Sequence, residues 1–195
     1  MAAAAINRRK AKLEVRLARA SDAPGIAALV DRVYGDRMSG YSRGMIRAQI
    51  NHYPEGQFIA LYEGEVVGYC ASMRLDERLA LSPHNWAEIT NDGLGSRHDA
   101  TGDWLYGYEM CVDPKRRGVR IGQRLYDERK ALAQRLELKG IVFGARMPAY
   151  ARSRRKVAGP DAYISAVVEG KIKDPTIGFQ LRNGFEPIGV LADYL

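Results

Sequence analysis

Apolar residues follow two different rhythms along the chain, and short turn sequences separate the segments. Alternation with a period of two, and compact apolar or aromatic runs, predict strands, of which LEVRLA at 13–18 is the first. Glu63-Gly64 stands between two such runs and predicts a hairpin turn. The segments predicted as strands are 13–18, 57–62, 65–74, 104–112, 141–146 and 185–191.

Apolar residues at spacings of three, four and seven predict helices between these strands. Ser21 and Pro24 open the first helix and Gly35 follows its end, as is typical of helix caps. The segments predicted as helices are 21–34, 42–52, 121–136, 161–169 and 174–182, with a short one near 86–90. We expect the face of 121–136 opposite its apolar stripe to be solvated. That face carries Arg124, Asp127, Glu128, Arg129, Lys130 and Arg135.

The remaining stretches, 34–41, 75–102 and 147–159, have no period and are predicted to be irregular. The resulting order, β-α-α-β-β-β-α-β-α-α-β, predicts a mixed α/β or α+β fold with one sheet covered by helices. With 195 residues and 46% hydrophobic content, the chain is expected to form a single domain over 13–195. Residues 1–12 are expected to be a flexible N-terminal tail.

The stretch 104–135 combines a strand, a basic turn that contains glycine, and a helix. The first N–H groups of a helix lack intrahelical partners and carry partial positive charge, so this arrangement predicts an anion site, usually for phosphate. A P-loop needs its second glycine where Gln123 stands, and GxGxxG needs three glycines where only Gly118 and Gly122 are present. Both of these nucleotide-binding motifs are therefore excluded.

The sequence RGVRIG at 117–122 resembles the acetyl-CoA loop of the GNAT superfamily of N-acetyltransferases, whose pattern is Q or R, then xxGx, then G or A. Arg117 and Gly122 match its ends, and Arg120 stands where the family usually has its central glycine. The resemblance extends from about residue 13 to the end and implies a GNAT-like acyl-CoA acyltransferase fold. In that fold, a mostly antiparallel central sheet has splayed central strands and is covered by helices. Four segments resemble one GNAT subgroup in particular, which is often fused to a nitrilase-type carbon–nitrogen hydrolase. They are 86–90, 107–112, 122–127 and 179–185.

By this resemblance acetyl-CoA is the co-substrate, and the loop amides hold its pyrophosphate. The strand at 110–112 would splay from its neighbour at 141–146, so that the pantetheine arm pairs with the exposed backbone. An N–H of Cys111 or Val112 would meet the thioester carbonyl oxygen. The predicted cofactor-binding residues are Met110, Cys111, Val112, Arg117, Gly118, Val119, Arg120, Ile121, Gly122 and Gln123.

Glu109 is the candidate general base, because it is the one carboxylate within an apolar and aromatic strand. Burial there would raise its pKa toward neutrality. Strand alternation predicts that Glu109 shares a face with Gly107 and Cys111, and not with Tyr108. The alternative is a structural carboxylate paired with a neighbouring arginine, Arg74 or Arg146.

The general acid is harder to assign. Many GNAT enzymes place a tyrosine four residues before the closing glycine, where this chain has Gln180, and glutamine cannot protonate a thiolate. Tyr150 is the candidate acid, with Tyr163 as a second candidate. Protonation by solvent is a third route, because a thiol with a pKa of about 8.5 needs little help near neutral pH.

The net charge of +7 favours anionic partners, and CoA, nucleic acid and acidic membranes all qualify. Nucleic acid is not expected, because no reading element is recognisable. No run of about 18 apolar residues predicts a membrane span. The start, MAAAAINRRK, does not have the order of a signal peptide, so the cytoplasm is expected. A catalytically silent acyl-CoA-binding module stays open as the second hypothesis.

Histidine and cysteine suggest no further cofactor. His52, His84 and His98 lack metal-ligand spacing with one another and with Cys70 and Cys111, so no metal is expected. The two cysteines are expected to be reduced core residues. The acceptor stays open among primary amines of a small molecule, an amino acid, a peptide N-terminus or a protein lysine. The 75–102 and 147–159 stretches are expected to shape its site, and a homodimer is also left open.

Overall fold

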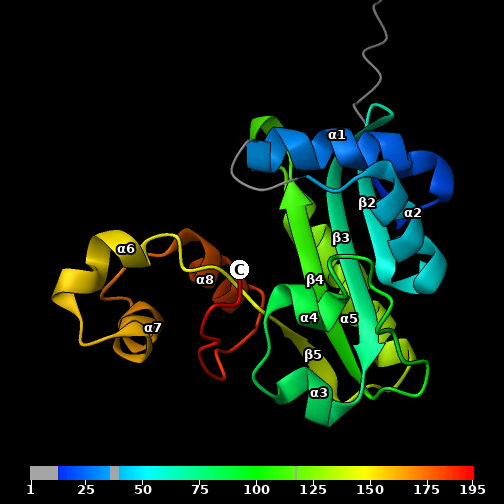
Figure 1. Ribbon diagram of the computed structural model, residues 1–195. Helices are drawn as coiled ribbons and strands as arrows, with labels where there is room; N and C mark the ends of the chain where they lie inside the picture. The colour runs from blue at the N-terminus through cyan, green and yellow to red at the C-terminus, as the bar shows by residue number, and fades with distance from the viewer. Residues whose placement is uncertain (1–12, 36–39, 117) are drawn as a thin grey trace, which may run out of the picture.

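The computed structural model describes residues 13–35, 40–116 and 118–195, so the predicted tail at 1–12 and the predicted ligand-binding residue Arg117 lie outside the described residues. Five strands form one sheet in the order β1-β2-β3-β4-β5 (Figure 1). The first four strands are antiparallel neighbours, whereas β4 and β5 are parallel. This confirms the mixed, mostly antiparallel sheet predicted above. The strands are β1 Leu13–Leu17, β2 Gln57–Tyr62, β3 Glu65–Leu75, β4 Trp104–Val112 and β5 Gly140–Phe143.

Helices cover both faces of the sheet, and their ends follow the capping chemistry of the sequence. Pro24 lies in the first turn of α1, and Gly35 ends it with φ of 54°. The Ser42 side chain accepts from the amide of Met45 at the start of α2. The α-helices are α1 Ala23–Tyr34, α2 Arg43–His52, α3 Glu77–Leu81, α4 Trp86–Thr90, α5 Ile121–Arg135, α6 Tyr150–Ser153, α7 Pro160–Val168 and α8 Pro175–Arg182. Short 3₁₀ turns occur at Ala20–Asp22, Pro54–Gly56, Pro114–Arg116 and Arg154–Lys156.

Two hydrophobic clusters lie on opposite faces of the sheet. Helices α1 and α2 bury Ile26 and Ile46 against β3 and β4, where Tyr69 is also fully buried. Helix α5 buries Leu125 and Leu132 on the other face. Each large apolar side chain buried in this way contributes about 1.5–3 kcal/mol. These two layers hold β4, the strand that carries the candidate site, in the middle of the structure.

A third, smaller cluster joins α6, α7 and α8 at one side of the sheet (Figure 1). Its buried members are Ala149, Tyr163, Val167 and Ile177. Asp174 caps α8 and also accepts from the Tyr163 hydroxyl at 2.6 Å. The helix α6 was not predicted, because residues 147–159 show no helical period.

The predicted closing strand at 185–191 is wrong, because no described residue after Phe185 belongs to a strand. Phe185 packs on Tyr126 and Phe143, with ring centroids 4.9 and 4.8 Å apart. Beyond it, Pro187 has no N–H to give to a ladder, and Ile188 is 75% exposed. The apolar alternation in this segment therefore reflects contacts of single side chains and not a sheet.

The fifth strand is also shorter than predicted. It ends at Phe143, where its pairing with Gly107 of β4 ends, although the apolar run suggested a strand up to residue 146. Gly144 follows directly, and the Arg146 guanidinium lies over the Tyr34 ring, 5.1 Å from its centroid. The chain after Phe143 thus leaves β4 and turns toward the end of α1.

Candidate active site at the splay of β4 and β5

Among the described residues, no strand pairs with the second half of β4 on its β5 side. Pairing with β5 covers Trp104 to Gly107, whereas pairing with β3 continues to Val112. The amide of Asp113 donates to Val67 O of β3 at 2.9 Å. Because amides two residues apart in a strand point the same way, Cys111 N–H also faces β3 and Val112 N–H faces the gap. Of the two amides proposed for the thioester oxygen, the geometry favours Val112.

A β-bulge changes the direction of Glu109. Gly107 is paired with Ser72 and Glu109 with Ala71, so Tyr108 is an additional residue in β4. The bulge puts Tyr108 and Glu109 on the same face, toward α1, while a Cβ on Gly107 would point into α5. The prediction that Glu109 shares a face with Gly107 and not with Tyr108 is therefore wrong, because the extra residue breaks the alternation. Cys111, the other residue predicted on this face, does lie on the α1 side.

Glu109 is buried and held by hydrogen bonds. Its Oε1 accepts from the Tyr34 hydroxyl at 2.6 Å and from the Met110 amide at 2.9 Å. Burial raises the pKa of Glu109, and hydrogen bonds from Tyr34 and Tyr41 oppose this rise. The direction agrees with the sequence expectation. Neither tyrosine was predicted as a partner of Glu109.

The arginine partners considered for Glu109 differ in position. The Arg74 side chain donates to Gly102 O at 2.9 Å and is not among the groups that shift the pKa of Glu109. The positive charge of Arg146 lowers the pKa of Glu109, but less than the hydrogen bonds do. Glu109 is thus a desolvated carboxylate held mainly by hydroxyl groups.

Arg129 supports the bulge from the opposite face. Its guanidinium donates to Ser72 Oγ, Ala71 O and Glu109 O, each at 2.9 Å. Gly107 leaves the necessary space, because an added Cβ would lie 2.6 Å from Arg129 Nη1. The prediction that Arg129 is solvated is wrong, since only 1% of this residue is exposed. A charged residue flanked by charged neighbours gave no signal of burial.

The start of α5 is the predicted anion site, and it is open. No described side chain caps the helix, and no acidic residue lies in its first turn. Gly118, Val119 and Arg120 are exposed, whereas Ile121 is buried. Gly118 has φ of 89°, and Arg120 adopts the left-handed conformation with φ of 60°. A non-glycine residue in that conformation costs about 1 kcal/mol or more, and such strain is concentrated at functional sites.

Gly122 has a packing role in addition to its predicted one. An added Cβ would lie 2.9 Å from Phe179 Cζ of α8. The Phe179 ring in turn stacks on Tyr126, 5.6 Å between centroids. A large residue at position 122 would therefore disturb α8 as well as any bound ligand.

The position where many GNAT enzymes have the acid, Gln180, lies in α8, and the candidate acid Tyr150 lies in α6. Gln180 accepts from the Tyr126 hydroxyl at 2.6 Å, close to Phe179. Tyr150 lies in α6 with its ring against Tyr163, 5.2 Å between centroids. Figure 1 shows α6 above α7, on the side of α8 that faces away from the sheet. The structure thus does not group Tyr150 with Glu109, and its role stays a prediction.

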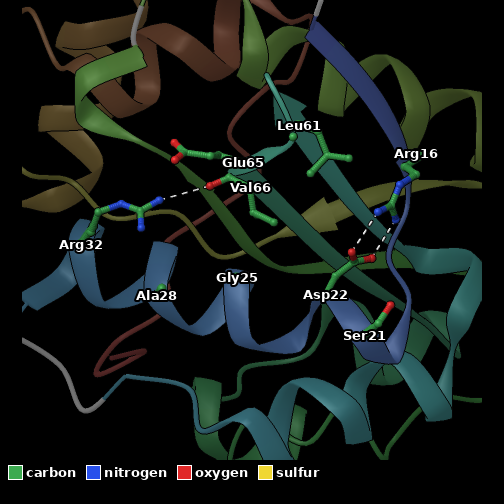
Figure 2. Close-up of a pocket in the computed structure, with 10 residues that line it drawn as sticks. Arg16, Ser21, Asp22, Gly25, Ala28, Arg32, Leu61, Glu65 and Val66 are labelled. Atoms are coloured by element: carbon green, nitrogen blue, oxygen red, sulfur yellow. Dashed lines mark hydrogen bonds and ion pairs between the residues drawn. The ribbon is translucent and has the colours of Figure 1, made fainter.

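A hollow of about 400 Å³ lies elsewhere, between β1, the start of α1 and the β2–β3 turn. In Figure 2, Arg16 points to Asp22 and Arg32 to the carbonyl of Val66. Arg32 also pairs with Asp113 at 3.1 Å, just before the α5 loop. None of the predicted catalytic or cofactor-binding residues lines this hollow, and its lining side chains Arg16, Asp22 and Arg32 already have partners. It is not the candidate active site.

Two further observations concern the described residues only. They contain no group of three histidine, cysteine, aspartate or glutamate side chains placed to hold a metal ion. Within them, no helix has the length and apolar character needed to cross a membrane. Both cysteines are free and buried, as expected for core residues.

Comparison with known proteins identifies the class. The profile of the acetyltransferase (GNAT) family matches residues 26–155. That is two thirds of the chain, which therefore belongs to the GNAT family. This confirms the resemblance of the 117–122 loop and the expected fold. The narrower resemblance, to members fused to nitrilase-type hydrolases, stays a prediction.

Individual relatives carry different names. The probable hydrolase YhcX of Bacillus subtilis (strain 168) is 39% identical over 158 residues, which cover 81% of this chain but only 31% of YhcX. The uncharacterized N-acetyltransferase YkwB of the same organism is 29% identical over 155 residues, covering 80% of this chain and 68% of YkwB. Among solved structures, the GNAT-like decarboxylase GphF in complex with isobutyryl-CoA superposes with a TM-score of 0.79 and 27% identity, covering 93% of this chain and 90% of that chain. The family and this neighbour support a substrate site based on CoA.

Proposed function

We propose that this protein is an N-acetyltransferase that moves an acetyl group from acetyl-CoA directly to a primary amine. The observation that carries the proposal is the position of Glu109. This buried carboxylate lies in the half of β4 that does not pair with β5, and the chain continues from there to the uncapped start of α5. We also propose that residues 13–195 act as one domain, and that the protein works in the cytoplasm without a metal.

The backbone performs most of the binding in this proposal. The amides at the start of α5, with Gly118, Val119, Arg120 and Gln123, would hold the pyrophosphate. The free edge of β4 at Met110 to Val112 would pair with the pantetheine arm, as an added strand does. The amide of Val112 would then stabilise the developing oxyanion. Such positioning supplies much of the rate in a direct transfer between two bound substrates.

Glu109 would take a proton from the incoming ammonium. Its raised pKa suits this task, because a base is most effective when its pKa lies near the working pH. The amine nitrogen then attacks the thioester carbon, the N–C bond forms and the C–S bond breaks. The leaving sulfur must gain a proton, for which the sequence proposes Tyr150 of α6; a donor nearer to β4 is the alternative.

The acceptor would enter on the α1 side of the sheet. Tyr34 and Tyr41 both hydrogen-bond to Glu109, and Trp86 of α4 lies against Tyr41 with 6.0 Å between ring centroids. Aromatic walls of this kind suit a primary amine on an apolar or flat group, in a small molecule or a peptide.

A second candidate is decarboxylation of a carboxyacyl-CoA. It is supported by the GNAT-like decarboxylase GphF, which superposes over nearly the whole chain. A third, the catalytically silent acyl-CoA-binding module, is supported by Gln180 in place of the usual tyrosine.

One experiment separates these three candidates. The purified protein and its Glu109→Gln variant are titrated with acetyl-CoA by calorimetry and then assayed for free thiol with a panel of primary amines. We expect binding in both, amine-dependent thiol release in the wild type, and a loss of about 100-fold or more in the variant. Release of CO₂ from malonyl-CoA without an amine would favour decarboxylation, and binding without either product would favour the silent module. Unchanged turnover in Glu109→Gln would remove Glu109 as the base.

A further inference from the structure

Three side chains from distant parts of the sequence form a chain of hydrogen bonds beside β4. His84 Nδ1 lies 2.7 Å from Ser82 O, and its Nε2 lies 2.7 Å from the Tyr106 hydroxyl. The Tyr106 hydroxyl lies 2.9 Å from the Tyr194 hydroxyl. Tyr106 is fully buried, whereas His84 and Tyr194 are partly exposed. The chain thus links two accessible groups through a buried one.

The directions of these hydrogen bonds follow from the chemistry of the groups. A carbonyl oxygen can only accept, so the proton of the neutral His84 ring is on Nδ1, facing Ser82 O. The unprotonated Nε2 then accepts from Tyr106, and the Tyr106 oxygen accepts from Tyr194. At rest, every hydroxyl proton therefore points toward His84, which is the terminal base of the chain.

The inner end of the chain lies where β4 and β5 separate. Gly144 follows the last residue of β5, and an added Cβ there would lie 2.2 Å from the Tyr194 ring. Hydrogen bonding with the Gly144 backbone lowers the pKa of both tyrosines. The Trp86 amide donates to the backbone oxygen of Tyr194 at 2.8 Å, which holds the C-terminal residues against the start of α4. Figure 1 marks the C-terminus on this side of the sheet. The negative charge of Glu109 is near enough to raise the pKa of Tyr194.

The transfer reaction has a step that Glu109 alone does not cover. An ammonium must lose two protons to become an amide, and the thiolate that leaves must gain one. Glu109 accounts for the proton lost before attack. The second proton remains on the nitrogen of the tetrahedral intermediate, and Gln180 offers no acid for the sulfur.

We propose that Tyr194 exchanges this second proton with the substrate, with Tyr106 and His84 as its relay. As Tyr194 takes the proton from nitrogen, its own proton passes to Tyr106 and that of Tyr106 passes to His84 Nε2. When the C–S bond breaks, the reverse movement returns one proton to sulfur, and both tyrosines and His84 end neutral. The relay rests on the proposed acetyl transfer, since it handles the proton of that reaction.

The surroundings of His84 agree with a resting neutral ring. Burial lowers its pKa, while the hydrogen bond to Ser82 O and the charge of Glu88 on α4 oppose this. The rings of Tyr106 and Tyr194 approach it edge-on, 5.3 and 5.9 Å between centroids. At neutral pH, His84 is thus ready to accept a proton and does not begin as an imidazolium.

The relay is tested by breaking it at each link with Tyr194→Phe, Tyr106→Phe and His84→Gln. We expect each to lower the maximal rate about 10- to 100-fold, with an unchanged KM for acetyl-CoA. The Tyr106→Phe/His84→Gln double variant should be no slower than either single variant, because members of one unit are not additive. Tyr53→Phe removes another buried tyrosine hydroxyl, outside the candidate site, and serves as the control that should leave the rate unchanged.

The pH dependence distinguishes the relay from Glu109. At a pH above the pKa of the amine, the substrate binds as the neutral amine and needs no base before attack. The rate of Glu109→Gln should therefore rise toward that of the wild type, whereas the rates of the relay variants should stay low. Wild-type rates in Tyr106→Phe and His84→Gln, or additive losses, would overturn the relay even if Glu109 proves to be the base.

A spectroscopic test does not need turnover. In ¹⁵N-histidine spectra assigned with His84→Gln, we expect an Nδ1–H tautomer whose Nε2 signal shifts in Tyr106→Phe and on addition of acetyl-CoA. An Nε2–H tautomer, or a signal that is indifferent to both changes, would refute the relay. If the wild type transfers no acetyl group to any amine, the proposed function fails, and this spectrum still reports on the hydrogen-bond chain itself.

Discussion

The half of β4 that does not pair with β5 leads to two parts of the candidate site, which depend on different kinds of structure. At the α5 end, the predicted contacts are exposed backbone amides and a strained loop within a few residues of one another. At the Glu109 end, a buried carboxylate depends on Tyr34, Tyr41 and a bulge supported by Arg129. The first end needs only a local sequence, whereas the second needs the whole fold. Changes at the two ends should therefore separate binding of acyl-CoA from chemistry.

The largest effect is expected from Arg129→Met. The variant strands the carbonyls of Ala71 and Glu109, at about 1–3 kcal/mol for each buried group without a partner. The bulge then loses its support, so the rate should fall while the affinity for acetyl-CoA changes little. Urea unfolding, the maximal rate and calorimetry measure the three quantities.

Arg135→Met, on the exposed face of the same helix, is the matched control and should be nearly neutral. If Arg129→Met weakened acetyl-CoA binding as strongly as it lowered the rate, the two ends of the site would not be separable.

An intermediate effect is expected from Gly118→Ala compared with Gly64→Ala. Both glycines have positive φ, 89° and 86°, and neither would meet another atom within 4 Å of an added Cβ. Each substitution should therefore destabilise the fold by a similar amount, about 1 kcal/mol. Only Gly118→Ala should weaken binding of acetyl-CoA, by about 10-fold, which is about 1.4 kcal/mol. Equal affinities in calorimetry would dismiss the loop as the phosphate site.

The smallest effect concerns the stability of Glu109→Gln as a function of pH. Burial raises the pKa of Glu109 in the folded protein above its unfolded value. The folded state then binds more protons between these two values, so stability falls as pH rises through that window. Glu109→Gln should remove this pH-dependent loss of stability. At pH 7 the variant should therefore have a higher Tm than the wild type, whereas at pH 4 it should not. Each kcal/mol would appear as about 2–4 °C in Tm, and identical melting at both pH values would contradict a desolvated Glu109.

The sequence was most informative where structure depends on neighbours along the chain. The hairpin at Glu63-Gly64, the end of the first helix at Gly35 and the succession of strand and helix in β4 and α5 all follow local rules, and the structure confirms them. The GNAT family assignment followed from the same unit.

What could not be predicted depends on contacts between distant residues. Tyr34 and Glu109 are 75 positions apart. The bulge at Tyr108 has no signature in an apolar run, and it reversed the expected face of Glu109. The apolar alternation after Phe185 looked like a strand, but Pro187 and an exposed Ile188 leave it without a ladder.

The small cluster of α6, α7 and α8 has a consequence for turnover. Four buried residues contribute little stability by themselves, so these helices should open at lower free energy than the sheet. Their contact with α5 runs through Phe179 and Phe185 around Tyr126, and Phe179 lies against Gly122. If spent CoA leaves from the start of α5, its departure is coupled to the most easily loosened part of the molecule. The rate of turnover would then be limited by local opening of these three short helices.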